Sequence, residues 1–304
     1  MFNVSVIIPT YNRGYDIRKS IYSVINQSYK PYEIIVVSDG SNDNTKEVVE
    51  NIMREYPFIS FYEYFPNRGA NFARNYGIKK SKGDYIAFLD DDDQWLEKKL
   101  EKQMNIFKRY NNIDLVYTGL NNIYLEDNIK YISLPEKYDN ISKEILFHNI
   151  VSTTSTVCVK KDVLIDVGGF DENLPALQDY ELWIRICQKY KIYGIREPLI
   201  NYYNRRNKSK QISSKTNNYV KAIEYIYIKH KNLYSNFDSE LMKRKKTYDN
   251  QLLLNKEMRN NNRKQAIRYA IKNIRINKKV KYLIYLFVAL LPYKIVLLLR
   301  AHQT

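Results

Sequence analysis

The 304-residue chain is long enough for one large domain, or a domain with an appendage, around a substantial core. Its two cysteines, Cys158 and Cys187, have neither CxxC nor metal-type spacing and lie among apolar residues, so we expect buried free thiols in a reducing compartment. The net charge of +16 comes entirely from the C-terminal third, because residues 200–304 hold 24 Lys and Arg against 5 Asp and Glu, whereas residues 1–199 hold 25 against 28. This asymmetry favours a polyanionic partner for that third, either nucleic acid or anionic lipid.

The first part of the chain alternates short apolar runs with amphipathic segments. Apolar runs that end in turn residues predict strands at 4–8, 32–37, 59–64 and 85–89. Apolar residues at helical spacing predict helices between them, at 15–27, 44–55 and 71–80. Strands that alternate with helices of this length indicate βαβ crossovers and a mainly parallel sheet, so we assign the chain to the α/β class.

The rest of the chain is expected to continue with mixed elements and then to change character. Helices are predicted at 96–110, 161–167 and 179–190, and strands at 115–125, 129–134, 154–159 and 191–195, the last followed by a loop at Pro198. Beyond about Ser213 the sequence is basic, rich in Tyr and Ile and without Gly, which predicts long helices. We therefore place one domain at residues 1–210 and a basic helical region at 211–304.

Several common sequence signals are missing from the chain. Met1 leads directly into the first predicted strand without a basic segment or a cleavage site, so we expect no signal peptide and a cytoplasmic location. Neither GxGxxG after the first strand nor GxxxxGK[ST] is present. Dehydrogenase and P-loop NTPase functions are thereby excluded.

Four consecutive carboxylates, Asp90–Asp93, follow the predicted strand at 85–89. Like charges this close repel one another and raise the pKa values of the carboxyl groups, unless a cation or hydrogen-bond donors offset them. Mg²⁺ and Mn²⁺ take oxygen ligands and are often shared between one or two carboxylates and the phosphates of a substrate. The cluster is therefore either a cation site at the carboxyl edge of the sheet or a solvated acidic turn.

Five polar segments are predicted at strand ends or loops on the same side of the sheet. They read PTYN at 9–12, SDGSND at 38–43, NRGANFARN at 67–75, LDDDDQW at 89–95 and QDYELWIR at 178–185. In this order and spacing, they resemble the family 2 glycosyltransferases of the GT-A fold over about residues 3–205. The resemblance implies a mixed, mainly parallel sheet flanked by helices, and inverting transfer from a nucleotide sugar.

The resemblance also implies roles for individual residues. The nucleotide-sugar site would comprise Pro9, Tyr11, Asp39, Arg74, Asp90 and Asp91. Tyr11 would stack on the base, and Asp39 would accept the imino proton of uracil and so select a UDP-sugar. Asp92 would ligate Mn²⁺ or Mg²⁺, and Asp179 would take the proton from the acceptor hydroxyl. Structural roles stay open beside these, with Asp39 as a turn residue and Asp93 and Asp179 as helix caps.

Three departures from the family pattern bear on the mechanism. The Glu that commonly precedes the catalytic Asp is Gln178 here. The loop after the last predicted strand lacks the His that often completes the metal site, so either Asp92 and phosphate oxygens hold the metal alone or Arg205 and Arg206 neutralise the diphosphate. The Gln-x-x-Arg-Trp motif of processive members is absent, which favours the transfer of a single sugar.

An apolar segment at 282–299 lies near the end of the basic region. Pro292 and Lys294 interrupt it, so it falls short of a 20-residue membrane span, and a basic run at 275–281 precedes it. Our hypothesis is an interfacial segment that docks peripherally on anionic lipid at the inner face of the cell membrane. The alternative is a helix pair packed on the catalytic domain.

Together these features predict a metal-dependent, inverting glycosyltransferase. It would move one sugar from a nucleotide sugar, with a UDP-sugar as the expected donor, to a glycan or lipid-linked acceptor in surface polysaccharide biosynthesis. No nucleic acid partner is expected. A nucleotidyltransferase acting on sugar phosphates would need a Gly-, Arg- or Lys-rich phosphate loop after the first strand. A non-catalytic membrane-binding protein on the same scaffold would not need Asp39, Asp92 and Asp179.

Overall fold

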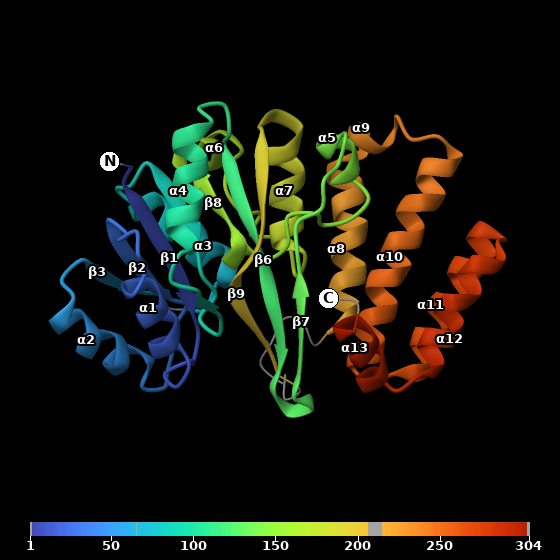
Figure 1. Ribbon diagram of the computed structural model, residues 1–304, viewed down its shortest axis with the longest axis horizontal. Helices are drawn as coiled ribbons and strands as arrows, with labels where there is room; N and C mark the ends of the chain where they lie inside the picture. The colour runs from blue at the N-terminus through green and yellow to red at the C-terminus, as the bar shows by residue number, and fades with distance from the viewer. Residues whose placement is uncertain (1, 65, 206–214, 303–304) are drawn as a thin grey trace.

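The computed structural model describes residues 2–64, 66–205 and 215–302. Within them, one mixed sheet of nine strands has the order β3-β2-β1-β4-β8-β6-β9-β5, with β7 paired to β6 (Figure 1). The strands are β1 (Val4–Thr10), β2 (Glu33–Ser38), β3 (Ile59–Glu63), β4 (Tyr85–Phe88), β5 (Gln94–Trp95), β6 (Leu115–Tyr124), β7 (Ile129–Ser133), β8 (Cys158–Lys160) and β9 (Ile192–Asn204). This arrangement confirms the predicted α/β class and mixed sheet.

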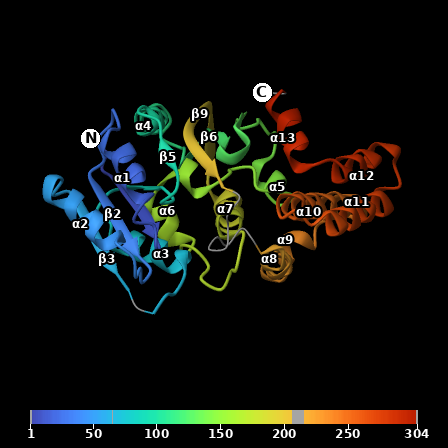
Figure 2. The same ribbon diagram turned by 90° about the horizontal axis from the view of Figure 1, so that it is seen from below.

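Helices cover the sheet and then form a separate group at one end of the molecule. Those of the first part are α1 (Ile17–Ile25), α2 (Thr45–Glu55), α3 (Ala70–Lys80), α4 (Lys99–Arg109), α5 (Ile141–Glu144), α6 (Lys161–Asp166) and α7 (Gln178–Lys189). The C-terminal group is α8 (Thr216–Lys229), α9 (Lys231–Tyr234), α10 (Ser239–Arg259), α11 (Arg263–Asn277), α12 (Leu283–Leu290) and α13 (Tyr293–Ala301). Figures 1 and 2 both show this group at the end opposite β3 and α2.

The parallel strands bring the polar segments to one edge of the sheet. Ile7 in β1 pairs with Ile35 in β2 on one side and with Phe88 in β4 on the other. Every residue of β1, β2 and β4 is buried, as expected for the near-continuous apolar strands of a sheet covered on both faces. Because the three strands run in the same direction, the residues after Thr10, Ser38 and Phe88 leave the sheet together.

Two predictions of strand bounds are wrong. Strand β9 does not stop at Ile195 but continues through Pro198 to Asn204, and Pro198 lies opposite Gly119, where the β6–β9 register shifts. An irregular ladder position tolerates a residue without an N–H, which is why proline does not end the strand. The strand expected at 154–159 is a 3₁₀ turn (Thr154–Thr156) followed by β8.

Asp93 is not a helix cap. The residues after it form β5, which pairs with β9, and α4 begins only at Lys99 with Lys98 as its N-cap. Asp93 is instead fully buried, and its Oδ2 accepts a hydrogen bond from the Ser155 hydroxyl at 2.7 Å. The Asp93 side chain therefore holds the acidic loop to the 3₁₀ turn that contains Ser155.

The C-terminal helices share an apolar core with the sheet domain. One cluster of buried residues contains Leu182 and Trp183 of α7 together with Ala222 of α8 and Leu253 of α10. This core crosses the predicted boundary, which itself falls in residues 206–214, outside the described residues. Cys158 and Cys187 are buried and free, as expected.

A buried carboxylate, that of Glu181, joins α7 to the C-terminal helices. Glu181 has no exposed surface and pairs with Arg185 at 2.7 Å, Lys229 at 2.8 Å and His230 at 3.0 Å. Burial raises the pKa of Glu181, but hydrogen bonds from His230 and Arg185 and the Arg185 charge bring it down to about 2. Because this pKa is below the ordinary value of 4.5, the stabilisation is complete above about pH 4.5 and is lost as the pH falls through about 2.

Glu181→Gln should therefore lower the free energy of unfolding at neutral pH by about 3 kcal/mol, because the neutral amide loses the ion pairs that the buried carboxylate makes with Arg185 and Lys229. Urea denaturation measures the effect. Glu172→Gln is the matched control, since Glu172 meets Arg68 only at 3.9 Å and both side chains are exposed; we expect less than about 1 kcal/mol there. Equal losses in the two variants would contradict a special role for the buried Glu181 carboxylate.

Candidate active site

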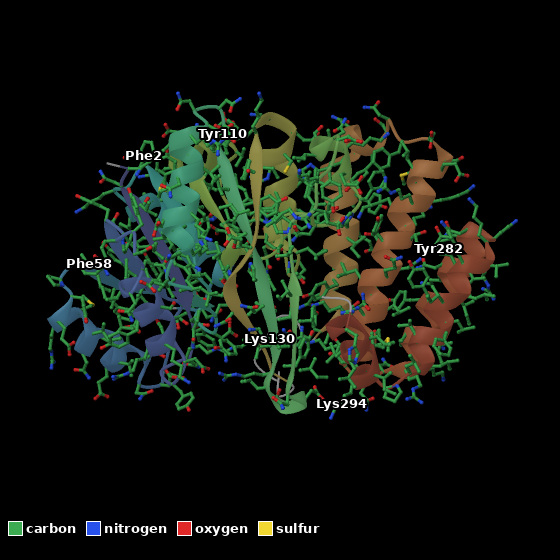
Figure 3. The ribbon with its side chains drawn as sticks, in the orientation of Figure 1. Phe2, Phe58, Tyr110, Lys130, Tyr282 and Lys294 are labelled. Atoms are coloured by element: carbon green, nitrogen blue, oxygen red, sulfur yellow. The ribbon has the colours of Figure 1, made fainter. Side chains whose placement is uncertain are left out.

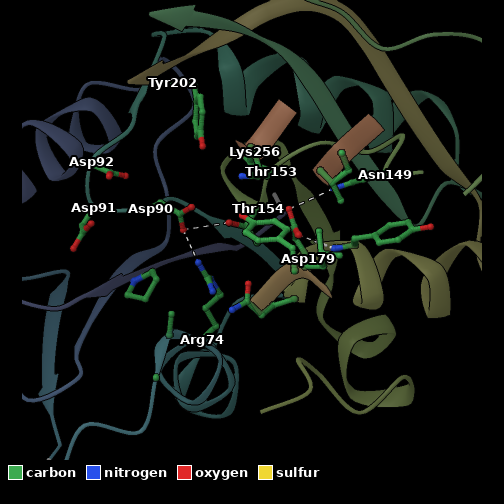
Figure 4. Close-up of a pocket in the computed structure, with 18 of the residues that line it drawn as sticks. Arg74, Asp90, Asp91, Asp92, Asn149, Thr153, Thr154, Asp179, Tyr202 and Lys256 are labelled. Carbon is green, nitrogen blue, oxygen red and sulfur yellow. Dashed lines mark hydrogen bonds and ion pairs between the residues drawn. The ribbon is translucent and has the colours of Figure 1, made fainter. Parts of the chain in front are cut away.

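A cavity of about 820 Å³ opens beside the carboxyl ends of β1, β2 and β4 (Figure 4). Residues from all five polar segments reach it, as do residues of α8 and α10. The lining includes every residue predicted for the site: Pro9, Tyr11, Asp39, Arg74, Asp90, Asp91, Asp92 and Asp179. The sequence therefore predicted which residues meet, although their individual roles stay predictions.

The acidic loop after β4 is held by serine hydroxyls from two elements. Ser20 of α1 donates its hydroxyl to the carbonyl oxygens of Asp91 at 2.9 Å and Asp93 at 2.7 Å. The Asp90 backbone N–H donates to the Ser155 hydroxyl at 3.1 Å. The loop conformation is thus fixed by the protein itself, so the carboxylates are in place before any substrate arrives.

Two arginines face the carboxylates of this loop. Arg74 of α3 donates to Asp90 at 2.7 Å, and the Thr154 hydroxyl donates to the same oxygen at 3.2 Å. Arg13 lies 3.7 Å from both Asp91 and Asp92. Arg13 was missed by the sequence analysis; its position directly after the PTYN segment was the available signal. Arg74 is tied to Asp90 rather than exposed on the surface.

The two arginines do not fully offset the negative charge of the loop, because the pKa values of three of its carboxyl groups are raised. Burial, and then the charge of Asp92, raise the pKa of Asp91 to about 8. Burial and the charge of Asp90 also raise the pKa of Asp92, and burial and the charge of Asp92 raise that of Asp93 well above its ordinary value. A further cation near the loop would therefore be bound favourably.

The donor set fits a divalent cation shared with a substrate. The Asp92 side chain is 20% exposed and lines the cavity, and carboxylate oxygen is the ligand that Mg²⁺ and Mn²⁺ prefer. Within residues 2–64, 66–205 and 215–302, no group of three His, Cys, Asp or Glu side chains could hold a metal ion by itself. Such a cation would take its remaining ligands from substrate phosphates and water.

Arg205, at the start of the segment that lacks the family's His, is paired with a side chain next to α1. Arg205 forms two hydrogen bonds to Asp16, at 2.9 and 2.6 Å, and Asp16 in turn lies 3.9 Å from Arg13. Arg205 therefore supports Arg13 through a shared carboxylate. Arg206 lies outside the described residues.

Asp39 fixes the loop that follows β3. The backbone N–H groups of Arg68 and Gly69 donate to its two carboxylate oxygens at 2.8 and 2.7 Å. Gly69 has φ +94°, a conformation that L side chains rarely adopt, so glycine suits this position. Each carboxylate oxygen keeps a second lone pair, so Asp39 can hold this loop and still accept a hydrogen bond from a base.

Asp179 lies in the first turn of α7, whose N-cap is Leu177. Its oxygens accept the Tyr180 backbone N–H at 2.8 Å and the Asn149 side-chain amide at 3.4 Å. Burial raises the pKa of Asp179 to about 6, against the opposing Tyr180 hydrogen bond and Arg74 charge. A carboxylate with this pKa is ionised at neutral pH and basic enough to accept a proton.

The wall of the cavity beyond Asp179 comes from the C-terminal helices, which sequence reasoning missed. Its α10 residues are Lys245, Tyr248, Asp249, Leu252, Lys256 and Arg259. They recur every three or four residues and so share one helix face, a signal that the sequence did contain. Lys245 pairs with Asp249 at 2.5 Å, while Lys256 stands 4.2 Å from the centre of the Tyr219 ring.

The family with the description "Glycosyl transferase family 2" matches residues 5–167. The chain belongs to this family. It is 32% identical over 242 residues to an uncharacterized glycosyltransferase of Haemophilus influenzae, covering 77% of this chain and 80% of the relative. It is 31% identical over 205 residues to the putative teichuronic acid biosynthesis glycosyltransferase TuaG of Bacillus subtilis, covering 66% and 78%. The chain is accordingly a glycosyltransferase.

Two solved structures have a similar fold. One is S. aureus TarS 1–349 in complex with UDP-GlcNAc, with a TM-score of 0.59 and 17% identity, covering 90% of this chain and 81% of that one. The other is the mannosyltransferase PcManGT of Pyrobaculum calidifontis in complex with GDP-Man and Mn²⁺, with a TM-score of 0.56 and 16% identity, covering 99% and 87%. Both likenesses support the GT-A type of fold.

Proposed function

We propose that this glycosyltransferase moves a single sugar from a UDP-sugar to a glycan or lipid-linked acceptor in the synthesis of a surface polysaccharide. The observation that carries the proposal is that Asp179 and the strand-end carboxylates Asp90–Asp92 line one cavity. A base on one side and a diphosphate site on the other are what a single displacement requires. The names of TuaG and of the TarS complex with UDP-GlcNAc support the polysaccharide and the donor.

In this proposal the chemistry rests on few groups. Asp179 accepts the proton of the acceptor hydroxyl. At the same time the oxygen of that hydroxyl bonds to the anomeric carbon of the donor sugar, and the bond from this carbon to the diphosphate breaks. Tyr11, with 44% of its surface exposed at the cavity, stacks on the base, and Asp39 accepts the imino N–H of uracil. Mn²⁺ or Mg²⁺ ligated by Asp92 would offset the charge of the leaving diphosphate.

Release of a nucleoside diphosphate tests the proposal. Purified full-length protein is incubated with UDP-, GDP- and dTDP-sugars in the presence and absence of Mn²⁺, and the diphosphate released is quantified. We expect slow, Mn²⁺-dependent hydrolysis of at least one UDP-sugar and much less hydrolysis of the GDP- and dTDP-sugars. Hydrolysis of no donor, or a clear preference for a guanine nucleotide, would contradict the proposed donor. Because the chain belongs to a glycosyltransferase family, the nucleotidyltransferase and the non-catalytic alternatives are wrong.

The proposal also places the enzyme peripherally at the inner face of the cell membrane, through α12 and α13. No single helix of the described chain is long and apolar enough to cross a membrane. Val280–Leu290, which ends with α12, and α13 together have that length and composition, with a bend of 118° between them. One side of the pair is buried, at Ala289, Val296 and Leu297. The packed-pair alternative therefore accounts for one face only.

The other face of the pair is apolar and exposed. Its residues, each at least 40% exposed, are Leu283, Ile284, Phe287, Leu290, Ile295, Leu298 and Leu299. Exposed basic residues lie beside it in the chain: Arg275, Lys278, Lys279, Lys281 and Lys294. Figure 3 shows Tyr282 and Lys294 on this C-terminal group of helices. An apolar face next to basic residues suits an anionic lipid surface, to which each nearby Lys or Arg contributes about 1 kcal/mol.

Vesicle flotation should show the full chain bound to vesicles with anionic lipid and much less to neutral ones. Ile284→Glu/Phe287→Glu should abolish this binding, because it places two carboxylates on the apolar face. Ile165→Glu/Ile228→Glu, two equally exposed apolar positions on α6 and α8, is the matched control and should bind like the wild type. Equal binding by all three proteins would contradict membrane docking through this face.

A further inference from the structure

Two cations on α10 face the cavity from the side of Asp179. Lys256 and Arg259 both line it, and their spacing of three residues puts them on one face of the helix. Figure 4 shows Lys256 and Asp179 pointing into the same pocket. Below, these two residues are called the α10 cation pair.

The other cations of the cavity already have partners. Arg74 is paired with Asp90, Arg13 lies against Asp91 and Asp92, and Lys245 is paired with Asp249. Within the residues that the structure describes, neither Lys256 nor Arg259 has an acidic side chain within 4.0 Å. Two like charges on one helix face repel each other, so an anion between them would be bound favourably.

The surroundings of Lys256 place this anion near Asp179. Lys256 rests over the Tyr219 ring, and its amine is close enough to Asp179 to be affected by the charge of that carboxylate. Burial lowers the pKa of Lys256 to about 8, against that charge, so the amine is largely protonated at neutral pH. Arg259 carries a permanent charge. The acceptor hydroxyl has to meet Asp179, so a group bound by the pair belongs to the acceptor end of the cavity.

We propose that the α10 cation pair binds an anionic group, a phosphate or a carboxylate, on the acceptor next to the hydroxyl that is glycosylated. This inference rests on the proposed function, because it takes Asp179 as the base and the strand-end loop as the diphosphate site. It narrows the acceptor to anionic glycans or phosphate-linked molecules. It also gives the C-terminal helices a part in acceptor choice.

Calorimetric titration of the full chain tests the proposal in two steps. UDP with Mg²⁺ is titrated first, and then inorganic phosphate or glucuronate is titrated into the protein saturated with UDP and Mg²⁺. Wild type is compared with Lys256→Gln/Arg259→Gln. The control, Lys243→Gln/Lys246→Gln, removes the same charge at the same spacing from α10 residues that do not line the large cavity.

We expect the UDP-saturated wild type to bind at least one of the two anions. The cation-pair variant should bind it at least tenfold more weakly and should keep its Kd for UDP within about twofold, which also shows that it is folded. The control should behave like the wild type.

Anion binding that is absent in the wild type, or equally weak in both variants, would overturn the proposal. A tenfold loss of UDP affinity in the cation-pair variant would assign the pair to the donor diphosphate instead. Failure of the wild type to bind UDP at all would contradict the proposed function and this inference with it.

Discussion

Replacing Asp179 by Asn should lower the rate of sugar transfer by about 10²- to 10⁴-fold, which is the usual contribution of a general base. The amide is nearly the same size, and its oxygen can still accept the Tyr180 N–H that now binds Asp179. Asn cannot take a proton, however, so the acceptor oxygen attacks without assistance. Rates measured at saturating donor and acceptor separate this effect from weaker binding. A variant that keeps more than a tenth of the wild-type rate would show that another group is the base.

The raised pKa of Asp179 gives the same variant a stability signature. Because the folded-state pKa of about 6 is above the ordinary 3.8, the protonated carboxyl favours the fold, and this benefit is lost as the pH rises through 6. At pH 7.5 the buried charge therefore destabilises the wild type, and Asp179→Asn should have the higher Tm. At pH 5 the difference should be about half as large, and it should vanish only below about pH 3.8, where the unfolded carboxyl is protonated too. The rate kcat/KM of the wild type should fall about tenfold per pH unit below about pH 6.

Asp92→Ala should be the second large loss, with transfer reduced about hundredfold or more. Stabilisation of the leaving diphosphate by a bound cation is worth several kcal/mol, and about 1.4 kcal/mol corresponds to a factor of ten. Binding gives an independent measurement, because wild-type protein should bind UDP more tightly with Mn²⁺ than with EDTA. In Asp92→Ala this difference should disappear.

Asp139→Ala is the control for that variant, since Asp139 is exposed and does not line the cavity. It should keep both the rate and the Mn²⁺-dependent affinity. If Asp92→Ala retained a Mn²⁺ effect on UDP binding as large as that of the wild type, Asp92 would not be the metal ligand. The neighbouring carboxylates Asp90 and Asp91 would then be the next to test.

Sequence patterns predicted the structure correctly where it depends on residues close to one another in the chain. The apolar runs of β1, β2 and β4 predicted parallel strands, and parallel strands deliver Tyr11, Asp39 and Asp90 to one edge whatever the rest of the chain does. Asp179 came from the resemblance rather than from the sheet pattern. Its helix α7 was predicted from apolar spacing and lies within one residue of the expected bounds.

Contacts between distant segments were the part that no local pattern could give. The pairing of Arg205 with Asp16 depends on the end of β9 lying beside the start of α1. The entry of Lys256 into the cavity depends on how α8 and α10 pack against α7. Composition drew attention to the charge of the C-terminal third as a lipid-binding feature. In the structure these basic residues lie in two places. Lys256 and Arg259 line the cavity, whereas Lys278 and Lys279 are exposed and precede the apolar helix α12 in the chain. The predicted strand at 191–195 was too short because the irregular position of β9 opposite Gly119 depends on the partner strand β6, which a local pattern does not contain.

The central claim is that one cavity performs a single displacement, with Asp179 as base and the diphosphate as leaving group. The most direct test is the configuration of the sugar released from an α-linked UDP-sugar that the wild type hydrolyses, recorded by ¹H NMR before the anomers equilibrate. Attack from the Asp179 side, opposite the departing diphosphate, predicts that the β-anomer appears first. First appearance of the α-anomer would contradict single displacement and the role assigned to Asp179.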